Sequence, residues 1–215
     1  MNAYRALVAE VDDELERCGR PRGSVTVVGV SKRQPVERIV AAIDAGLGDV
    51  GENYVQEAKA KFARLPAVRK HFIGHLQTNK AKAIAATFDV VQSVDRIDAG
   101  DALGKAASAL GKEIPVLLQL NISPSERFGC PPERAPELAE ALRAQRGLRL
   151  DGVMAIGPMT ADEAEISRAF ELAAKTFALV GGSTLSIGMS GDWRQAVRAG
   201  STMIRIGTAL FGGRS

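Results

Sequence analysis

Short apolar runs alternate with longer stretches of helical periodicity along the whole chain. The runs are rich in Val, Ile and Leu, and they predict strands at residues 24–30, 47–51, 71–74, 89–94, 114–121, 150–156, 184–188 and 202–207. Apolar positions recurring every three to four residues predict helices at 35–45, 54–65, 79–87, 96–110, 132–146, 161–180 and 193–199. One more helix is predicted at 1–18, where Leu7, Val11 and Leu15 share one face.

The order of these elements predicts the fold class. The strands read as continuous apolar runs, which is typical of parallel strands covered on both faces. Eight strand–helix units in 215 residues predict one α/β domain over residues 1–215, a single (β/α)8 barrel of the TIM type with an extra N-terminal helix. No helical pattern follows the last strand, so the N-terminal helix is expected to fill the eighth helical place. The alternative is an open, doubly wound sheet.

Composition and charge exclude several classes of protein. Hydrophobic residues make up 46% of the chain and charged residues 25%, which is ordinary for a globular protein and excludes wholesale disorder. The net charge of +3 includes no basic run with interleaved aromatic residues, so no nucleic-acid partner is expected. Cys18 and Cys130 stand far apart and form neither a disulfide framework nor a zinc motif.

The sequence also predicts the compartment in which the protein acts. No apolar run reaches the ~18 residues that a membrane span requires. The N-terminal segment is rich in acidic residues and has no signal-peptide core. A cytoplasmic protein without membrane contact is therefore expected.

Candidate chemistry is sought at the strand ends, because parallel barrels carry their active sites at the carboxyl ends of the strands. Lys32 follows the first predicted strand, and Arg205 stands in the last. A lysine held partly neutral there could form a Schiff base with an aldehyde. In a closed barrel these two strands become neighbours, and the charge of Arg205 would lower the pKa of Lys32. A surface lysine and an arginine in a structural ion pair are the alternatives.

Two segments have the features of a phosphate site. Ser190, Gly191 and Asp192 open the helix after the seventh strand, and Gly207 and Thr208 follow the eighth. Backbone N–H groups at such turns bind anions, and barrels often bind phosphate with these two loops. An N-cap at Ser190 and glycines needed only for packing are the alternative interpretation.

Other polar residues point to no further chemistry. His71 and His75 are four residues apart, but the segment between them reads as a strand and no cluster of ligands completes a metal site, so none is expected. Glu57, Lys59 and Lys61 are interpreted as a solvated helix face.

Several stretches of the chain, taken in order, resemble one known family. The sequence resembles the YggS/PROSC-type pyridoxal 5′-phosphate homeostasis proteins, relatives of the N-terminal barrel of alanine racemase and members of fold type III among pyridoxal-phosphate proteins. The matching stretches are VGVSK at 28–32, GENYVQE at 51–57, HFIGHLQTNK at 71–80, LSIGMS at 185–190 and GSTMIRIGTALFG at 200–212.

The resemblance implies a cofactor, pyridoxal 5′-phosphate, and a role for particular residues. Lys32 would hold the cofactor as a Schiff base, and Asn53 would line the ring side of the pocket. Arg205 would face the pyridine nitrogen and keep it unprotonated, which limits carbanion chemistry. The phosphate would be bound by Ser190, Gly207 and Thr208.

The resemblance also implies a function. The protein would take part in vitamin B6 homeostasis by buffering pyridoxal phosphate or delivering it to apo enzymes. A monomer is expected, because no added domain supplies a dimer interface. Alanine racemase uses a tyrosine from a second domain of its partner subunit, and the tyrosines here are Tyr4 and Tyr54. Negligible racemase activity is therefore expected. An amino-acid racemase or lyase, and an unrelated phosphate-binding barrel without Schiff-base chemistry, are the alternatives.

Overall fold

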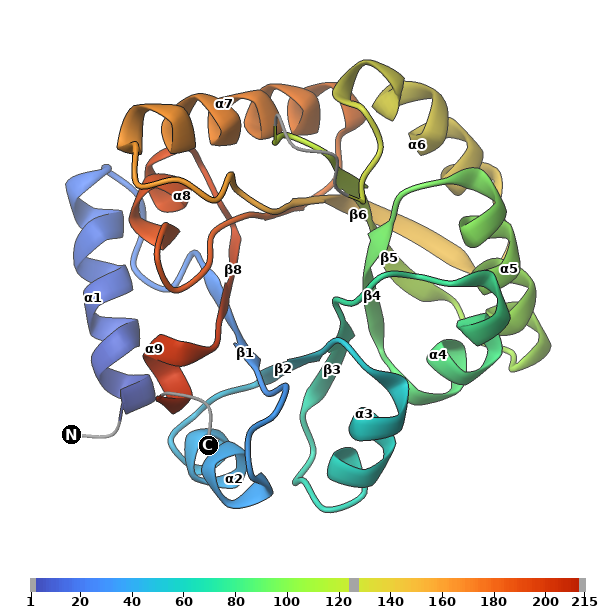
Figure 1. Ribbon diagram of the computed structural model, residues 1–215, viewed down its shortest axis with the longest axis horizontal. Coiled ribbons are helices and arrows are strands. Elements are labelled where there is room, and N and C mark those ends of the chain that lie inside the picture. Colours follow the sequence, from blue (N-terminus) through green and yellow to red (C-terminus); the bar gives the residue numbers. More distant parts are fainter. Residues whose placement is uncertain (1–2, 124–127, 213–215) are drawn as a thin grey trace.

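The chain forms a closed barrel of eight parallel strands, which pair in sequence order and are surrounded by helices (Figure 1). The computed structural model describes residues 3–123 and 128–212. The first and last strands pair directly, with Thr26 opposite Met203 and Gly29 opposite Ile206. The predicted barrel is thus confirmed, and an open doubly wound sheet is wrong.

The elements alternate as the sequence pattern predicts. The strands are β1 (Thr26–Val30), β2 (Asp49–Glu52), β3 (Arg69–Phe72), β4 (Val90–Val94), β5 (Ile114–Leu120), β6 (Leu148–Ala155), β7 (Thr184–Ser186) and β8 (Met203–Ile206). The helices are α1 (Ala3–Arg17), α2 (Val36–Asp44), α3 (Val55–Phe62), α4 (Ala81–Thr87), α5 (Ile97–Ala109), α6 (Ala135–Ala144), α7 (Glu163–Val180), α8 (Trp193–Arg198) and α9 (Thr208–Phe211), with short 3-10 turns η1 (Thr78–Lys80) and η2 (Pro132–Arg134).

Most residues of β1, β4 and β5 are apolar because both faces of these strands are covered. All residues of β4 are buried, for example. On β1, a Cβ atom at Gly29 would lie 2.7 Å from Leu47 and 3.2 Å from both Leu210 and Phe211, so this position faces the helices and has no room for a side chain. The opposite face of the same strand therefore points into the barrel.

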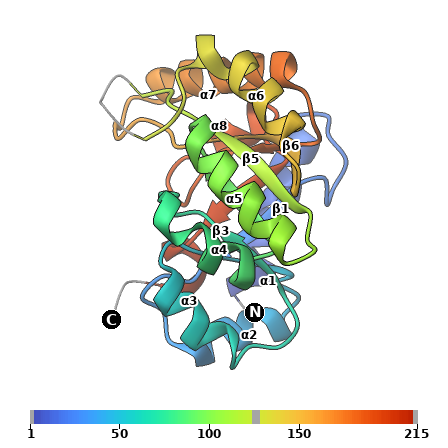
Figure 2. The same ribbon diagram turned by 90° about the vertical axis from the view of Figure 1, so that its right-hand side faces the viewer.

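The helices form a ring around the strands, and the turned view shows α3, α4 and α5 in front of the sheet (Figure 2). Helix α1 packs beside α8 and α9, at the seam where β8 meets β1. The expectation that no helix follows the last strand is wrong, since α9 follows β8 after one residue. None of the helices in the described part of the chain has the length and apolarity of a membrane span.

Candidate functional site

The six site residues singled out in the sequence lie at or just beyond the carboxyl ends of four strands. Lys32 comes two residues after β1, Asn53 directly follows β2, and Ser190 lies in the loop after β7. Arg205 lies in β8, which Gly207 and Thr208 follow. Because the barrel is closed, β7, β8, β1 and β2 are consecutive neighbours. All six residues therefore lie along one side of the barrel mouth.

Arg205 is buried inside the barrel and held by oxygen atoms. Its Nη1 donates to the carbonyl oxygen and to the Oγ of Ser186, both at 2.7 Å, and its Nη2 donates to the carbonyl oxygen of Ala155 at 2.8 Å. Burial lowers the pKa of Arg205 to about 10, although Asp192 acts in the opposite direction. The guanidinium therefore remains protonated at neutral pH. The alternative of a structural ion pair is not observed, because Arg205 forms no ion pair with any described residue.

A directed chain of hydrogen bonds runs from Arg205 through the barrel interior. Ser186 Oγ donates to Gln92 Oε1 at 2.7 Å, and Gln92 Nε2 lies 2.9 Å from His71 Nδ1. His71 Nε2 lies 2.8 Å from Asp49 Oδ1. Since the amide donates to Nδ1, the histidine proton belongs on Nε2, where it can be donated to Asp49. The chain connects a buried cation to a carboxylate near the other end of the barrel.

Ser190 accepts hydrogen bonds from the turn after the last strand. Its Oγ lies 3.3 Å from the backbone nitrogen of Gly207 and 3.4 Å from that of Ala209, and both N–H groups donate to it. The N-cap residue of α8 is Asp192, so Ser190 does not cap that helix. The structure thus brings the two predicted phosphate segments together, with N–H groups converging on one point beside the exposed Thr208.

Asp192 fixes the loop that carries Ser190. Its Oδ1 accepts a hydrogen bond of 2.6 Å from the backbone nitrogen of Met189. Burial raises the pKa of this carboxyl, and the hydrogen bond from Met189 and the charge of Arg205 act against that rise. This acidic side chain binds its own loop and thereby sets the position of Ser190.

Asn53 presents a buried polar atom at the mouth. Its Oδ1 has no hydrogen-bond partner among the described residues. The residue lines a cavity of about 490 Å³, whose other walls include Tyr54, Phe72, His75 and Lys80. A buried acceptor without a partner is costly in a folded protein, so this amide is suited to a bound molecule.

The interpretation of the charged positions on α3 as a solvated face is wrong for Lys61 and correct for Lys59. Lys61 is buried, and its Nζ binds Glu52 Oε1 at 2.8 Å and Glu57 Oε1 at 2.6 Å. Only Lys59 is exposed, as expected for a solvated face. Glu57 and Lys61 are four residues apart, which places them on the same side of a helix. This spacing was the one signal in the sequence that the two side chains could pair.

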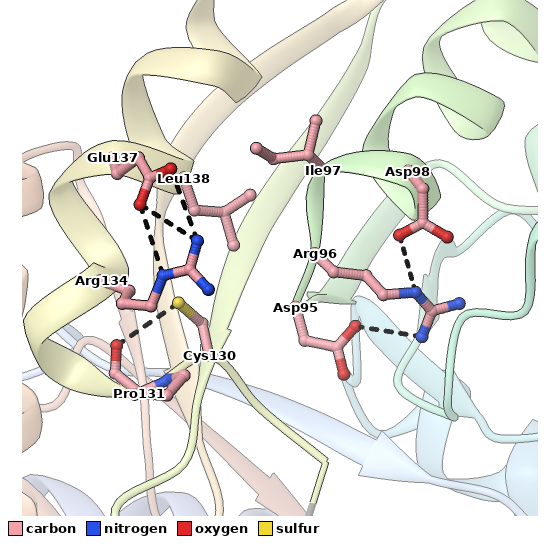
Figure 3. Close-up of a pocket in the computed structure, with 9 residues that line it drawn as sticks. All are labelled: Asp95, Arg96, Ile97, Asp98, Cys130, Pro131, Arg134, Glu137 and Leu138. Atoms are coloured by element: carbon pink, nitrogen blue, oxygen red, sulfur yellow. Dashed lines mark hydrogen bonds and ion pairs between the residues drawn. The ribbon is translucent and has the colours of Figure 1, made fainter.

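A second hollow, of about 200 Å³, lies between the N-terminal ends of α5 and α6 (Figure 3). Arg96 binds Asp98 at 2.8 Å, and Arg134 binds Glu137 at 3.2 Å. Burial raises the pKa of the Cys130 thiol, which also lines it. Because both arginines are already paired with carboxylates, we do not place a phosphate there.

Comparison with known proteins gives the chain its relatives. The family model for the N-terminal domain of alanine racemase matches residues 16–215. A Pseudomonas aeruginosa protein named pyridoxal phosphate homeostasis protein is 41% identical over 214 residues, which cover 97% of this chain and 93% of the relative. An Escherichia coli K12 protein of the same name is 39% identical over 232 residues, covering 100% of this chain and 98% of the relative.

Comparison with solved structures also places the chain among these relatives. PipY of Synechococcus elongatus, solved with pyridoxal phosphate bound, superposes with a TM-score of 0.83 at 33% identity. The match covers 94% of this chain and 100% of PipY. The likeness therefore extends over the whole barrel, including the four strands that carry the candidate site.

Proposed function

Because this chain belongs to the family of alanine racemase N-terminal domains, and within it to the pyridoxal phosphate homeostasis proteins, we propose that it binds pyridoxal 5′-phosphate and takes part in vitamin B6 homeostasis. Residues 1–215 would act as one cofactor-binding domain. One observation carries the proposal: an amine, a buried cation and an anion-binding turn come from neighbouring strands at one side of the barrel mouth.

The chemical groups at the mouth fit this cofactor. A phosphate needs N–H donors, and the N–H groups of Gly207 and Ala209 donate to Ser190 Oγ over long distances of 3.3 and 3.4 Å, so a phosphate oxygen that took the place of this hydroxyl would receive both. The pyridine ring carries polar atoms, and Asn53 offers a buried amide oxygen, Oδ1, that lacks a partner among the described residues. When bound, pyridoxal phosphate supplies an aldehyde, and Lys32 supplies the amine that would hold it as a Schiff base.

Arg205 suits the ring nitrogen as a donor. Three of its five N–H groups bind Ser186 and Ala155, which leaves donors for a ligand. With a pKa of about 10, the guanidinium keeps its proton at neutral pH. It would donate a hydrogen bond to the ring nitrogen and keep that nitrogen unprotonated, which would make the ring a weaker electron sink and favour storage over amino-acid chemistry.

We further propose that the protein acts as a monomer in the cytoplasm and passes its cofactor to apo enzymes. Of its two tyrosines, Tyr4 lies on α1 beside Gly46, and Tyr54 is 56% exposed. Neither arrangement gives the buried acid–base partner that a racemase reaction requires. A panel of amino acids incubated with the protein should therefore remain unconverted.

The proposal is tested by the visible absorbance of the protein with added pyridoxal phosphate, before and after borohydride. The wild type should turn yellow, lose the colour on reduction and carry the adduct on Lys32. Lys32→Ala should stay colourless. Lys59→Ala is the control, because Lys59 is an exposed lysine on α3 that does not line the cavity beside Asn53, and its loss should leave the colour unchanged. A wild type that stays colourless would refute the proposal.

A further inference from the structure

Lys32 lies between two residues whose main chain is tied to buried charges. On its N-terminal side, Ser31 is fully buried, and its Oγ donates to Glu52 Oε1 at 2.7 Å. The carbonyl oxygen of Ser31 accepts a hydrogen bond from Lys61 Nζ. The peptide group that leads into Lys32 is therefore anchored to β2 and α3.

On the C-terminal side, the next residue adopts an unusual conformation. Arg33 has a φ of 58°, and it is the one residue other than glycine with a positive φ in the described chain. A residue with a side chain is disfavoured in this left-handed region. Its backbone N–H donates to Glu57 Oε1 at 2.6 Å, so a carboxylate stabilises the turn that follows Lys32.

Lys61 connects the two anchors. Its Nζ binds Ser31, Glu52 and Glu57, which uses all three of its N–H donors. Partial burial acts to raise the pKa of Glu57, but hydrogen bonds from Lys61 and from the Arg33 backbone lower it below its usual value. Glu57 is thus ionised at neutral pH. Removing such charges from water costs about as much free energy as their mutual attraction provides, so stability alone rarely explains an ion cluster of this kind.

We propose that Glu57 and Lys61 are positioning residues that hold the main chain on both sides of Lys32, so that its amine is presented to the cofactor aldehyde. This inference rests on the proposed function. Neither residue needs to touch the cofactor, because both act through the peptide groups of Ser31 and Arg33. Without them the turn would relax, and a smaller fraction of molecules would present Lys32 correctly.

Two substitutions of Glu57 and one control variant provide the first tests of the proposal. Glu57→Ala removes the carboxylate from a partly exposed helix position, where alanine is a good helix former. Glu57→Gln keeps an oxygen acceptor for the Arg33 N–H. Glu37→Ala is the matched control, since it removes from α2 a carboxylate that forms an exposed ion pair with Arg64 in the turn after α3.

Affinity for pyridoxal phosphate is the first measurement. If only about one molecule in ten keeps the competent turn, Glu57→Ala should bind about tenfold more weakly. Glu57→Gln should recover most of this loss, and Glu37→Ala should bind as the wild type does. Arg33→Gly provides a sharper test, because glycine adopts positive φ freely. In the Arg33→Gly background, Glu57→Ala should cost much less affinity than in the wild type.

The second measurement needs no cofactor. In the cofactor-free protein, trace labelling of lysines read by mass spectrometry should show Lys32 reacting faster in Glu57→Ala, with exposed Lys59 as the internal reference. Unchanged labelling of Lys32, or an equal loss of affinity in both Arg33 backgrounds, would overturn the proposal. A wild type that binds no pyridoxal phosphate while Glu57→Ala still alters the labelling would refute the proposed function and support the positioning role.

Discussion

Gly74 approaches the main chain of Asn53 so closely that a single methyl group should disturb both stability and binding. A Cβ atom built on Gly74 would lie 2.1 Å from the Asn53 carbonyl oxygen and 2.8 Å from its carbonyl carbon. Real Cβ atoms essentially never come within 3.0 Å of such a neighbour. All of the conflicting atoms are backbone, so no side chain can rotate away to relieve the contact.

The size of the effect follows from this geometry. To reach an ordinary contact distance in Gly74→Ala, the end of β3 or the start of the Asn53 loop must move by roughly 1 Å, and overpacking of this kind costs about 1–3 kcal/mol. For a protein of this length, a loss of about 2 kcal/mol lowers Tm by about 4–8 °C. The shift also displaces the Asn53 amide, so affinity for pyridoxal phosphate should fall as well.

Urea and thermal unfolding measure the first effect, and titration with pyridoxal phosphate measures the second. Gly48→Ala is the matched control, because no atom lies within 4 Å of the added Cβ and its backbone φ is not in the left-handed region. The control should be neutral or slightly stabilising. If Gly74→Ala unfolds and binds as Gly48→Ala does, the contact relaxes without cost and the reasoning is wrong.

Two further substitutions test the hydrogen bonds inside the barrel and the loss of stability at acidic pH. Ser186→Ala removes an acceptor from Arg205 and the donor to Gln92 Oε1, so it should lower the free energy of unfolding by about 1–3 kcal/mol, and an unchanged urea midpoint would contradict this. Burial acts to raise the pKa of Glu14, but hydrogen bonds led by that from Arg198 lower it below 4.5. The stability it provides is present above pH 4.5 and lost as pH falls toward its folded pKa, so wild type should lose more stability than Glu14→Gln between neutral pH and about pH 4. Parallel losses in urea unfolding would contradict the second prediction.

The sequence predicted the barrel because parallel strands covered on both faces leave a local signal, a continuous apolar run. Even β2 was predicted, although it is short and contains glycine. Helix α9 was missed because it has only four residues, fewer than any periodic pattern needs. Its stability comes from packing beside α1, which local sequence does not show.

The sequence predicted that the candidate site residues lie at strand ends, but it did not reveal the residues that support them. Gln92 and Ser186 are 94 positions apart, and only the closed barrel brings them together. The sequence carried one clue, since Gln92 and Ser93 are polar residues in the fully buried strand β4. Lys61 was missed because helical spacing shows which residues share a face but does not show what that face covers.

The pairing of β1 with β8 also has a consequence for how the protein is made. Lys32 is synthesised before Arg205 and before the turn at Gly207, because it precedes both in the sequence. Because these groups meet only when β8 pairs with β1, the nascent chain cannot complete the proposed site until β8 has been synthesised. If the proposed site is correct, capture of pyridoxal phosphate follows closure of the barrel, and a chain that ends before β8 would not withdraw this cofactor from the cell.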